Sequence, residues 1–386
     1  MNKYDFDQIH ERRGTDSLKW QAYGSGVLPL WVADMDFQAP PEVLRALHAR
    51  INHGVFGYGG VKAELAKTIC NRLWQNYRWE VTPDQLVFLP GLVSGLNVVA
   101  KAVCTPNSGV LVQTPVYPPF LSAAANQGLK LDIAELDVIA SGPILHYRID
   151  FNALVSAIQP HTRLFMLCNP HNPVGRSYDR DELQRIAEIC LRHDLVICSD
   201  EIHCELQLDD TEHIPIASLS PELAECCITL MAPSKTFNIA GLYSGFAIIQ
   251  NPSLRKQVHA VMAGLVPEIN LLGLTAALAA YNECEQWRTE LLAYLKGNRD
   301  FVVSYIAEHL PMLRTTIPES TYLAWIDCQE AGFTGNPHTF FVQQAGVALN
   351  DGEPFGPGGS GFVRLNFGCP RSTLTQALEQ MRTALK

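Results

Sequence analysis

The stretch Ile228–Leu242 reads ITLMAPSKTFNIAGL, and its one charged residue is Lys235. An apolar run leads to this lysine, and small and hydroxylated residues surround it. A hydrated ammonium group avoids such a neighbourhood unless it is paired or its charge is removed, for instance by condensation with an aldehyde. Lys235 is therefore a candidate Schiff-base lysine. A surface lysine just past a strand is the other interpretation of this stretch, so the rest of the chain has to decide.

Length and composition indicate a well-packed globular protein. The chain has 386 residues, so we expect two domains, or one large domain with a smaller one attached. Hydrophobic residues make up 47% of the chain and charged residues 18%, which argues against disorder. The formal net charge of -10 repels phosphate backbones and anionic lipid. We therefore expect no nucleic-acid or membrane partner, although a local basic pocket could still bind a small anion.

Cysteine usage and the chain's apolar segments favour a reduced, cytoplasmic protein. Eleven cysteines are scattered without any C-x-x-C pair, so neither a zinc site nor another metal site is expected. The N-terminal residues MNKYDFDQIHERRG are polar and do not resemble a signal peptide. The apolar stretch Leu271–Tyr281 is far shorter than the roughly 18 to 20 residues that span a bilayer.

Short runs rich in Val, Ile and Leu alternate with longer segments of helical period. This alternation predicts an α/β fold with a mostly parallel sheet flanked by crossover helices. Asp181–His193 is the clearest helix, with one apolar face, acidic residues in its first turn and basic residues in its last. Right-handed crossovers place the carboxyl ends of the strands along one edge, where ligands bind. The predicted strands are Leu86–Leu89, Val110–Gln113, Leu164–Cys168, Leu195–Ser199, Ile228–Met231 and Phe246–Ile249.

The pattern changes in the C-terminal third of the chain. Leu271–His309 predicts one or two long helices broken near Gly297, and a smaller α+β domain follows. Its predicted elements are strands at Tyr322–Asp327, Val347–Leu349 and Phe362–Phe367 and a closing helix at Leu374–Leu385. The expected division is an N-terminal segment 1–45 that joins the small domain, a large domain 46–285 and a small C-terminal domain 286–386.

Two turns near the expected ligand edge suit a flat, phosphorylated ligand. Pro90–Gly95 follows the strand Leu86–Leu89 and opens the helical segment Leu96–Val103. Free N–H groups at such a helix start suit a phosphate, although glycine is common at strand-to-helix turns in any case. In the loop Thr114–Pro119, prolines stiffen the chain around Tyr117, which either stacks on a flat ring or packs as an ordinary loop aromatic.

Polar residues follow the next two predicted strands. After Leu164–Cys168, two Asn-Pro steps enclose His171 and restrict the backbone, so Asn172 is either a positioned hydrogen-bond donor or part of an ordinary turn. Asp200 follows Leu195–Ser199, and a buried carboxylate there needs a cationic or N–H partner. A protonated pyridine nitrogen would serve, and so would a helix cap or a structural ion pair.

Arg364 is the only charge in the predicted strand Phe362–Phe367. A guanidinium binds a carboxylate through a bidentate fork, whereas a surface arginine on an edge strand is the alternative. Taken with the other positions, it completes one site in chain order: phosphate cradle, ring stacker, hydrogen-bond donor, ring-nitrogen carboxylate, Schiff-base lysine and carboxylate clamp.

This order resembles the fold type I pyridoxal-phosphate enzymes, the aspartate aminotransferase superfamily, over nearly the whole chain. Within that superfamily the sequence is most similar to the MalY/PatB group of cystathionine β-lyases, also called cysteine-S-conjugate β-lyases. Seven phrases carry the resemblance: LPLWVADMDF (Leu28–Phe37), VFGY (Val55–Tyr58), QTPVYPPF (Gln113–Phe120), CNPHNPVGR (Cys168–Arg176), SDEIH (Ser199–His203), APSKTFNIAGL (Ala232–Leu242) and FVRLNFGCPR (Phe362–Arg371).

The resemblance implies pyridoxal 5′-phosphate as the cofactor, bound by the large domain. Lys235 and Tyr58 are the implied catalytic residues: Lys235 forms the Schiff base and later carries a proton, and Tyr58 reaches the phosphate of the neighbouring subunit. A homodimer with shared active sites follows. The implied cofactor-binding residues are Lys235, Asp200 at the ring nitrogen, Asn172 at the ring oxygen, Tyr117 stacked on the ring, Ser234, Leu92, Val93 and Tyr58 at the phosphate, and His203. The implied substrate-binding residues are Arg364, Asn172, Ala33 and Asp34.

The reaction implied by the resemblance is α,β-elimination from cystathionine or a related cysteine S-conjugate, which yields a thiol, pyruvate and ammonia. An aminotransferase of an amino acid is the main alternative, because it shares every step up to the carbanion and sequence spacing does not separate the two. A second alternative is additional regulatory binding to a transcription factor. One position departs from the broader aminotransferase pattern, in which a tyrosine stands where this chain has His203; the role of this histidine stays open.

Overall fold

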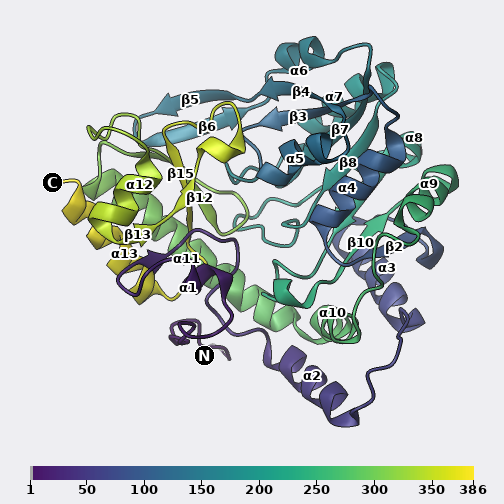
Figure 1. Cartoon of the computed structure of the whole chain (residues 1–386), viewed down its shortest axis with the longest axis horizontal. Helices are drawn as coiled ribbons and strands as arrows, with labels where there is room; N and C mark the ends of the chain where they lie inside the picture. Colours follow the sequence, from purple (N-terminus) through teal and green to yellow (C-terminus); the bar gives the residue numbers. More distant parts are fainter. Residues whose placement is uncertain (1–2) are drawn as a thin grey trace.

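The six strands predicted between residues 86 and 249 belong to one seven-stranded sheet in the computed structural model, which describes residues 3–386 (Figure 1). The strand order is β2-β10-β9-β8-β7-β3-β4, and the five strands from β9 to β4 are parallel. The prediction of a mostly parallel sheet is confirmed. The strands are β2 (Leu86–Leu89), β3 (Gly109–Thr114), β4 (Lys130–Glu135), β7 (Thr162–Cys168), β8 (Val196–Asp200), β9 (Cys227–Met231) and β10 (Gly245–Ile248).

Strand β10 runs antiparallel to both of its neighbours, β9 and β2, which makes the sheet mixed. Parallel neighbours are usually joined by a helix that crosses one face of the sheet. The segment 232–244 between β9 and β10 contains only the short 3-10 turn Ala240–Leu242. It carries Lys235 past the sheet edge and turns back, so the next strand enters from the opposite direction.

Helices cover both faces of this sheet because alternate side chains of each strand point to opposite sides. On β7, Leu164 and Met166 pack with α4, α5 and α9, whereas Phe165 and Leu167 pack with α3, α7, α8 and α10. The predicted helix Asp181–His193 is α7, displaced by one residue and begun by a capping box. The flanking helices are α3 (Ala63–Tyr77), α4 (Leu92–Val103), α5 (Pro118–Asn126), α6 (Phe151–Ala157), α7 (Arg180–Arg192), α8 (Pro221–Cys226), α9 (Pro252–Met262) and α10 (Leu271–Glu283).

A second, six-stranded sheet has the order β14-β15-β12-β11-β6-β5. Its strands β5 (Asp137–Ser141) and β6 (Ile144–Arg148) come from the middle of the chain and reach across to the C-terminal strands (Figure 1). Sequence reasoning missed β4, β5 and β6, because β4 and β5 are largely exposed and lack an apolar run. The predicted C-terminal strands are present. They are β12 (Leu323–Asp327), β13 (Val347–Ala348) and β15 (Phe362–Asn366), accompanied by β11 (Arg314–Thr316) and β14 (Asn350–Asp351).

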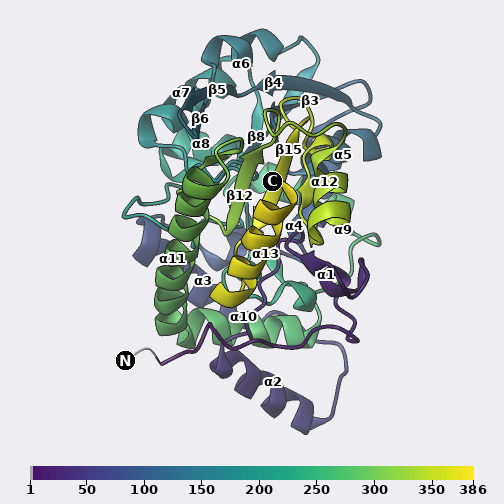
Figure 2. The same cartoon turned by 90° about the vertical axis from the view of Figure 1, so that its left-hand side faces the viewer.

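Two long C-terminal helices, α11 (Glu285–His309) and α13 (Arg371–Ala384), lie side by side against the second sheet (Figure 2). The helical segment Leu271–His309 breaks at Cys284, between α10 and α11, so the predicted break near Gly297 was wrong. Glycine weakens a helix only by about 1 kcal/mol, which tertiary packing outweighs. A β carbon at Gly297 would lie 3.3 Å from Nη2 of Arg371, so the glycine leaves room for α13.

The N-terminal segment joins the C-terminal part of the fold. Strand β1 (Leu28–Pro29) pairs in parallel with β13, and Phe6, Leu30 and Phe37 are buried in the same core as α11 and α13. The remaining helices are α1 (Leu18–Gln21), α2 (Pro41–His53) and α12 (Pro337–Phe340). Among the helices of residues 3–386, we find none with the length and apolar character needed to cross a membrane.

Candidate active site

The carboxyl ends of β7, β8 and β9 carry three of the predicted site residues. Asp200 is the last residue of β8, Asn172 lies in the loop after β7, and Lys235 lies in the loop after β9. Because these strands are parallel neighbours, their ends meet at one edge of the sheet. The charges of Asp200 and Arg364 both act on Lys235, so the structure brings Arg364 to the same place.

Lys235 is partly buried, and its Nζ donates a hydrogen bond to the carbonyl of Ala33 at 2.6 Å. Burial lowers the pKa of Lys235 to about 8, although the carboxylates of Asp34 and Asp200 act in the opposite direction. A buried lysine of this kind holds a larger fraction of neutral amine near pH 7 than an exposed one. Lys235 is thus suited to attack an aldehyde and to accept a proton.

Asp200 is a buried carboxylate that lacks a cationic partner within 4 Å among residues 3–386. Its Oδ1 accepts one hydrogen bond, from the N–H of Ile202 at 3.1 Å. Burial raises the pKa of Asp200 to about 7, and the charge of Glu201 adds to this. An unpaired buried carboxylate is costly, so the position fits a ligand that brings an N–H donor or a positive charge.

Arg364 has the complementary deficiency. Its side chain is 2% exposed, and burial lowers its pKa to about 10. Nη1 donates to Oδ1 of Asn172 at 2.9 Å, and Nη2 donates to Oδ1 of Asn350 at 2.7 Å and to the carbonyl of Trp31 at 3.2 Å. Nε lacks a partner. A buried guanidinium with only neutral acceptors fits an anionic ligand group such as a carboxylate.

Tyr117 directly precedes α5 as its N-cap residue and is held beside this group. Its N–H donates to the carbonyl of Asn172 at 3.0 Å, which joins the loop after β3 to the loop after β7. Burial raises the pKa of Tyr117, so its hydroxyl stays protonated. The charges of Arg364 and Asp200 both act on this side chain, so it lies at the same edge of the sheet.

The residues predicted to form an anion cradle lie at the start of α4. Leu92 and Val93 are its first residues after Gly91, and the first N–H groups of a helix have no partner within the helix. A β carbon on Gly245 would lie 2.7 Å from Cδ1 of Leu92 and 3.6 Å from Cβ of Ala232. The helix start therefore lies close to the loop that carries Ser234 and Lys235.

His203 is buried three residues after Asp200, and its ring centroid lies 6.0 Å from that of Tyr322 at an interplanar angle of 78°. In the part of the chain that the structure describes, its Nδ1 has no hydrogen-bond partner. Burial, reinforced by the charges of Lys235 and Arg364, lowers the pKa of His203 to about 3, so the imidazole is neutral. A neutral imidazole adds no positive charge beside Lys235.

Tyr58 lies apart from this cluster. Its side chain is fully exposed, in the loop between α2 and α3, where Val55 and Phe56 are exposed as well. Within one chain Tyr58 therefore contributes nothing to the site, whereas the other predicted positions gather around Lys235.

Sequence reasoning missed the side chains that hold the segment 31–37 against Lys235. The carbonyl of Ala33 accepts from Tyr322 Oη at 2.9 Å as well as from Lys235. Nδ2 of Asn366 donates to the carbonyls of Val32 and Asp34, each at 2.6 Å. The sequence signal for Asn366 was that it is a polar residue in a strand whose residues, apart from Arg364, are otherwise apolar.

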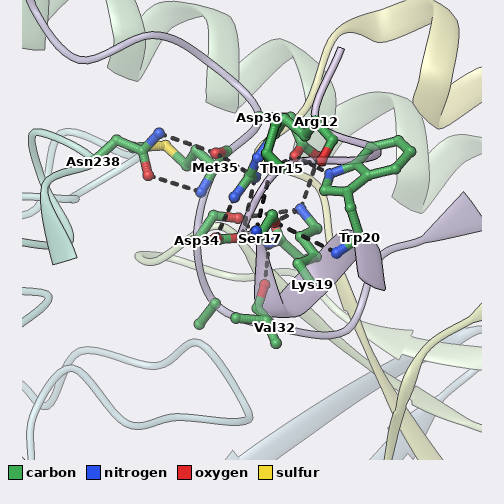
Figure 3. A network of polar contacts seen from close by, with 12 residues as sticks. Arg12, Thr15, Ser17, Lys19, Trp20, Val32, Asp34, Met35, Asp36 and Asn238 are labelled. Atoms are coloured by element: carbon green, nitrogen blue, oxygen red, sulfur yellow. Dashed lines mark hydrogen bonds and ion pairs between the residues drawn. The ribbon is translucent and has the colours of Figure 1, made fainter. Parts of the chain in front are cut away.

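Asn238 holds the other end of this segment (Figure 3). Its Nδ2 donates to the carbonyls of Met35 at 2.9 Å and Phe37 at 2.7 Å, and its Oδ1 accepts from the N–H of Met35 at 3.0 Å. Asn238 has a positive φ of 53°, which asparagine tolerates better than most residues. The loop that carries Lys235 is thereby joined directly to the N-terminal segment.

A buried ion cluster fixes the same segment from the opposite side (Figure 3). Lys19 is fully buried, and its Nζ lies 2.7 Å from Oδ2 of Asp36. Asp36 also accepts from Arg12 at 2.6 Å and from Nε1 of Trp20 at 2.8 Å, while Arg12 lies 2.8 Å from Asp34. Burial alone would raise the pKa of Asp36, but Lys19 and the other donors lower it below its ordinary value. The cluster is balanced in charge.

The chain belongs to the aminotransferase class I and II family, whose sequence profile matches residues 25–381. It is 37% identical to cystathionine beta-lyase PatB of Bacillus subtilis strain 168 over 99% of this chain and 100% of PatB. It is 31% identical to protein MalY of Escherichia coli strain K12 over 99% of both chains. The crystal structure of cystalysin from Treponema denticola, described as containing a pyridoxal 5′-phosphate cofactor, superposes with a TM-score of 0.94 at 34% identity, covering 99% of this chain and 98% of cystalysin.

Replacement of Lys19 by methionine should lower the free energy of unfolding by about 3 kcal/mol, because it leaves the buried carboxylate of Asp36 without its fully buried cation. Urea unfolding measures the change. Lys296→Met is the matched control, since Lys296 is half exposed and lies 3.6 Å from Asp209. The control should change stability by less than about 1 kcal/mol. Equal losses in the two variants would contradict a structural role for the cluster.

In the cofactor-free protein, reductive methylation of Lys235 should rise with pH through a midpoint near 8, because only the neutral amine reacts. An ordinary lysine has its midpoint near 10.4. Mass spectrometry of the Lys235 peptide at a series of pH values gives the profile, and the other lysine peptides of the same digest provide the reference. A Lys235 profile that coincides with this reference would refute the lowered pKa.

Proposed function

We propose that this chain is a pyridoxal-phosphate-dependent carbon–sulfur β-lyase that cleaves cystathionine or a related cysteine S-conjugate to a thiol, pyruvate and ammonia. The observation that carries the proposal is the grouping of a partly buried lysine, a buried carboxylate without a cation and a buried guanidinium without an anion. The names of the relatives support it, since PatB is a cystathionine beta-lyase and cystalysin contains pyridoxal 5′-phosphate.

The residues around Lys235 fit this cofactor group by group. Lys235 offers a neutral amine to the aldehyde, and Asp200 holds a proton on the ring nitrogen, which relieves the cost of its own burial. Tyr117 covers the ring, and Asn172 contacts the ring oxygen while it also accepts from Arg364. The phosphate-binding groups are the N–H groups of Leu92 and Val93 and the hydroxyl of Ser234. His203 borders the cofactor as a neutral imidazole.

When bound, pyridoxal phosphate supplies an electron sink for the negative charge left on the substrate's α-carbon. Arg364 binds the substrate carboxylate, and Ala33 and Asp34 border the substrate on the side of the N-terminal segment. The Lys235 amine takes the α-proton, which its lowered pKa favours near neutral pH. The carbon–sulfur bond then breaks and the sulfur leaves as a thiolate. Addition of water to the remaining three-carbon fragment gives pyruvate and ammonia.

We further propose a homodimer with shared active sites. Its support is a group of exposed apolar side chains: Val55, Phe56 and Tyr58 are each more than half exposed, which is unusual for neighbouring large apolar residues. Phe56, Tyr58 and Leu271 line one surface pocket, so the loop after α2 and the start of α10 meet there. In the proposed dimer, Tyr58 reaches the phosphate group in the partner's site.

The division into residues 1–45, 46–285 and 286–386 stays our proposal for the domain organisation. The two sheets and the pairing of β1 with β13 support it. We also propose a cytoplasmic location, because all eleven cysteines are free, as in proteins of a reducing compartment.

With cystathionine and no keto acid acceptor, the holoenzyme should release pyruvate and homocysteine over many turnovers. Lys235→Ala should lower kcat by about 10²- to 10⁴-fold through loss of the proton-transferring amine, whereas the surface change Lys296→Ala should not. A lactate dehydrogenase-coupled assay measures the pyruvate. A single turnover that ends with an aminated cofactor and no pyruvate would instead identify an aminotransferase.

Shared sites predict complementation between two inactive variants. Tyr58→Ala and Lys235→Ala protomers, once mixed as a heterodimer, form one site with both native residues and one site with neither. Co-expression with two different affinity tags isolates the heterodimer, which should recover about half of the wild-type lyase activity. If the heterodimer is no more active than its two parents, Tyr58 does not act in the partner's site.

A further inference from the structure

Arg364 differs from comparable arginines in lacking a carboxylate partner. The buried Arg299 forms ion pairs with Asp209 and Asp300, and the partly buried Arg72 forms ion pairs with Glu205 and Glu285. Within residues 3–386, no aspartate or glutamate oxygen lies within 4 Å of the Arg364 guanidinium. A buried cation without a counter-ion is costly, so the arrangement requires a reason in function.

Asn350 makes the shortest of the three hydrogen bonds to this guanidinium, at 2.7 Å to Nη2. It lies in the short strand β14, directly opposite Arg364 in the antiparallel pairing with β15. Side chains of directly paired residues point to the same face of a sheet, so the register brings the Asn350 amide to the arginine. The asparagine oxygen orients the guanidinium but carries no net charge.

A carboxylate stands one position away, at Asp351, and is kept from the arginine. Successive residues of a strand point to opposite faces, so Asp351 faces away from Arg364. Both of its carboxylate oxygens accept from Nδ2 of Asn336, each at 3.1 Å. A shift of one residue in β14 would exchange the two side chains and neutralise Arg364. The register of this two-residue strand therefore leaves the guanidinium's charge available.

We propose that Asn350 is a positioning residue that aims Arg364 without neutralising it, and that it thereby sets the preference of the site for amino acids over amines without a carboxylate. This inference rests on the proposed role of Arg364 as the substrate-carboxylate clamp. Asn350, Asn172 and the carbonyl of Trp31 fix the guanidinium before the substrate arrives. The substrate's carboxylate then supplies the missing negative charge, which an amine cannot do.

The test compares two small probes, glycine and methylamine, which differ by the carboxylate. Each is titrated against the pyridoxal-phosphate holoenzyme, and the change in cofactor absorbance gives its Kd. Asn350→Asp keeps the size of the side chain and adds a charge. Asn152→Asp is the matched control, because it makes the same chemical change at an exposed position of α6.

Asn350→Asp should raise the Kd of glycine about tenfold or more, because its carboxylate pairs with Arg364 in advance, and should leave the Kd of methylamine within about threefold. With a cysteine S-conjugate as substrate, KM should rise by a similar factor and kcat should change little. Asn152→Asp should change neither Kd. Asn350→Ala, which removes the acceptor without adding charge, should raise the Kd of glycine less than Asn350→Asp does.

Unchanged glycine binding in Asn350→Asp, or an equal loss of glycine and methylamine binding in both Asn350 variants, would overturn the proposal. If Asn350→Asp does not fold, which circular dichroism reveals, Asn350→Ala decides: a selective rise in the Kd of glycine supports the proposal and an equal rise for both probes refutes it. Glycine has no β-substituent, so these titrations report on Asn350 even if the wild-type enzyme proves not to be a lyase.

Discussion

The cost of burying an unpaired charge is the constraint on which this structure depends. Lys19 and Asp36 offset that cost by forming an ion pair with each other within the N-terminal segment. Lys235, Asp200 and Arg364 do not, and each has a pKa shifted toward its neutral form by burial. One group of buried charges is thus complete within the chain, whereas the other fits the proposed cofactor, which would bring an aldehyde and a ring N–H, and the proposed substrate, which would bring a carboxylate. Stability depends on buried charges that are paired within the chain, whereas the proposed function depends on buried charges that are not.

The unpaired buried charges of the site come from both sheets. The carboxyl ends of β8 and β9 position Asp200 and Lys235, whereas Arg364 comes from β15 of the second sheet. Between them runs the segment 31–37, whose carbonyl groups accept hydrogen bonds from both sides. The carbonyl of Ala33 accepts from Lys235, in the loop after β9 of the first sheet, and from Tyr322, which directly precedes β12 of the second sheet. The site is therefore a junction of three chain segments, and it depends on tertiary packing at each of them.

Sequence reasoning predicted the central strands because buried parallel strands are continuous apolar runs. It failed where local pattern and tertiary context disagree: β5 is exposed, and Gly297 lies inside a helix although glycine favours a break. Lys235 could be singled out because it contrasts with its apolar neighbours. The ion cluster of Lys19 and Asp36 could not, because these two residues are 17 positions apart and no local sequence pattern pairs them.

The sequence by itself determined the class of fold, the order of the site residues and the family to which the chain belongs, since these follow from apolar periodicity and from motifs of a few adjacent residues. Only the tertiary structure decided which charges are paired. Asn350 and Asp351 are neighbours in the chain, yet one contacts Arg364 and the other Asn336. The strand register makes that choice, because side chains alternate between the faces of a sheet and local composition does not specify which face meets the arginine.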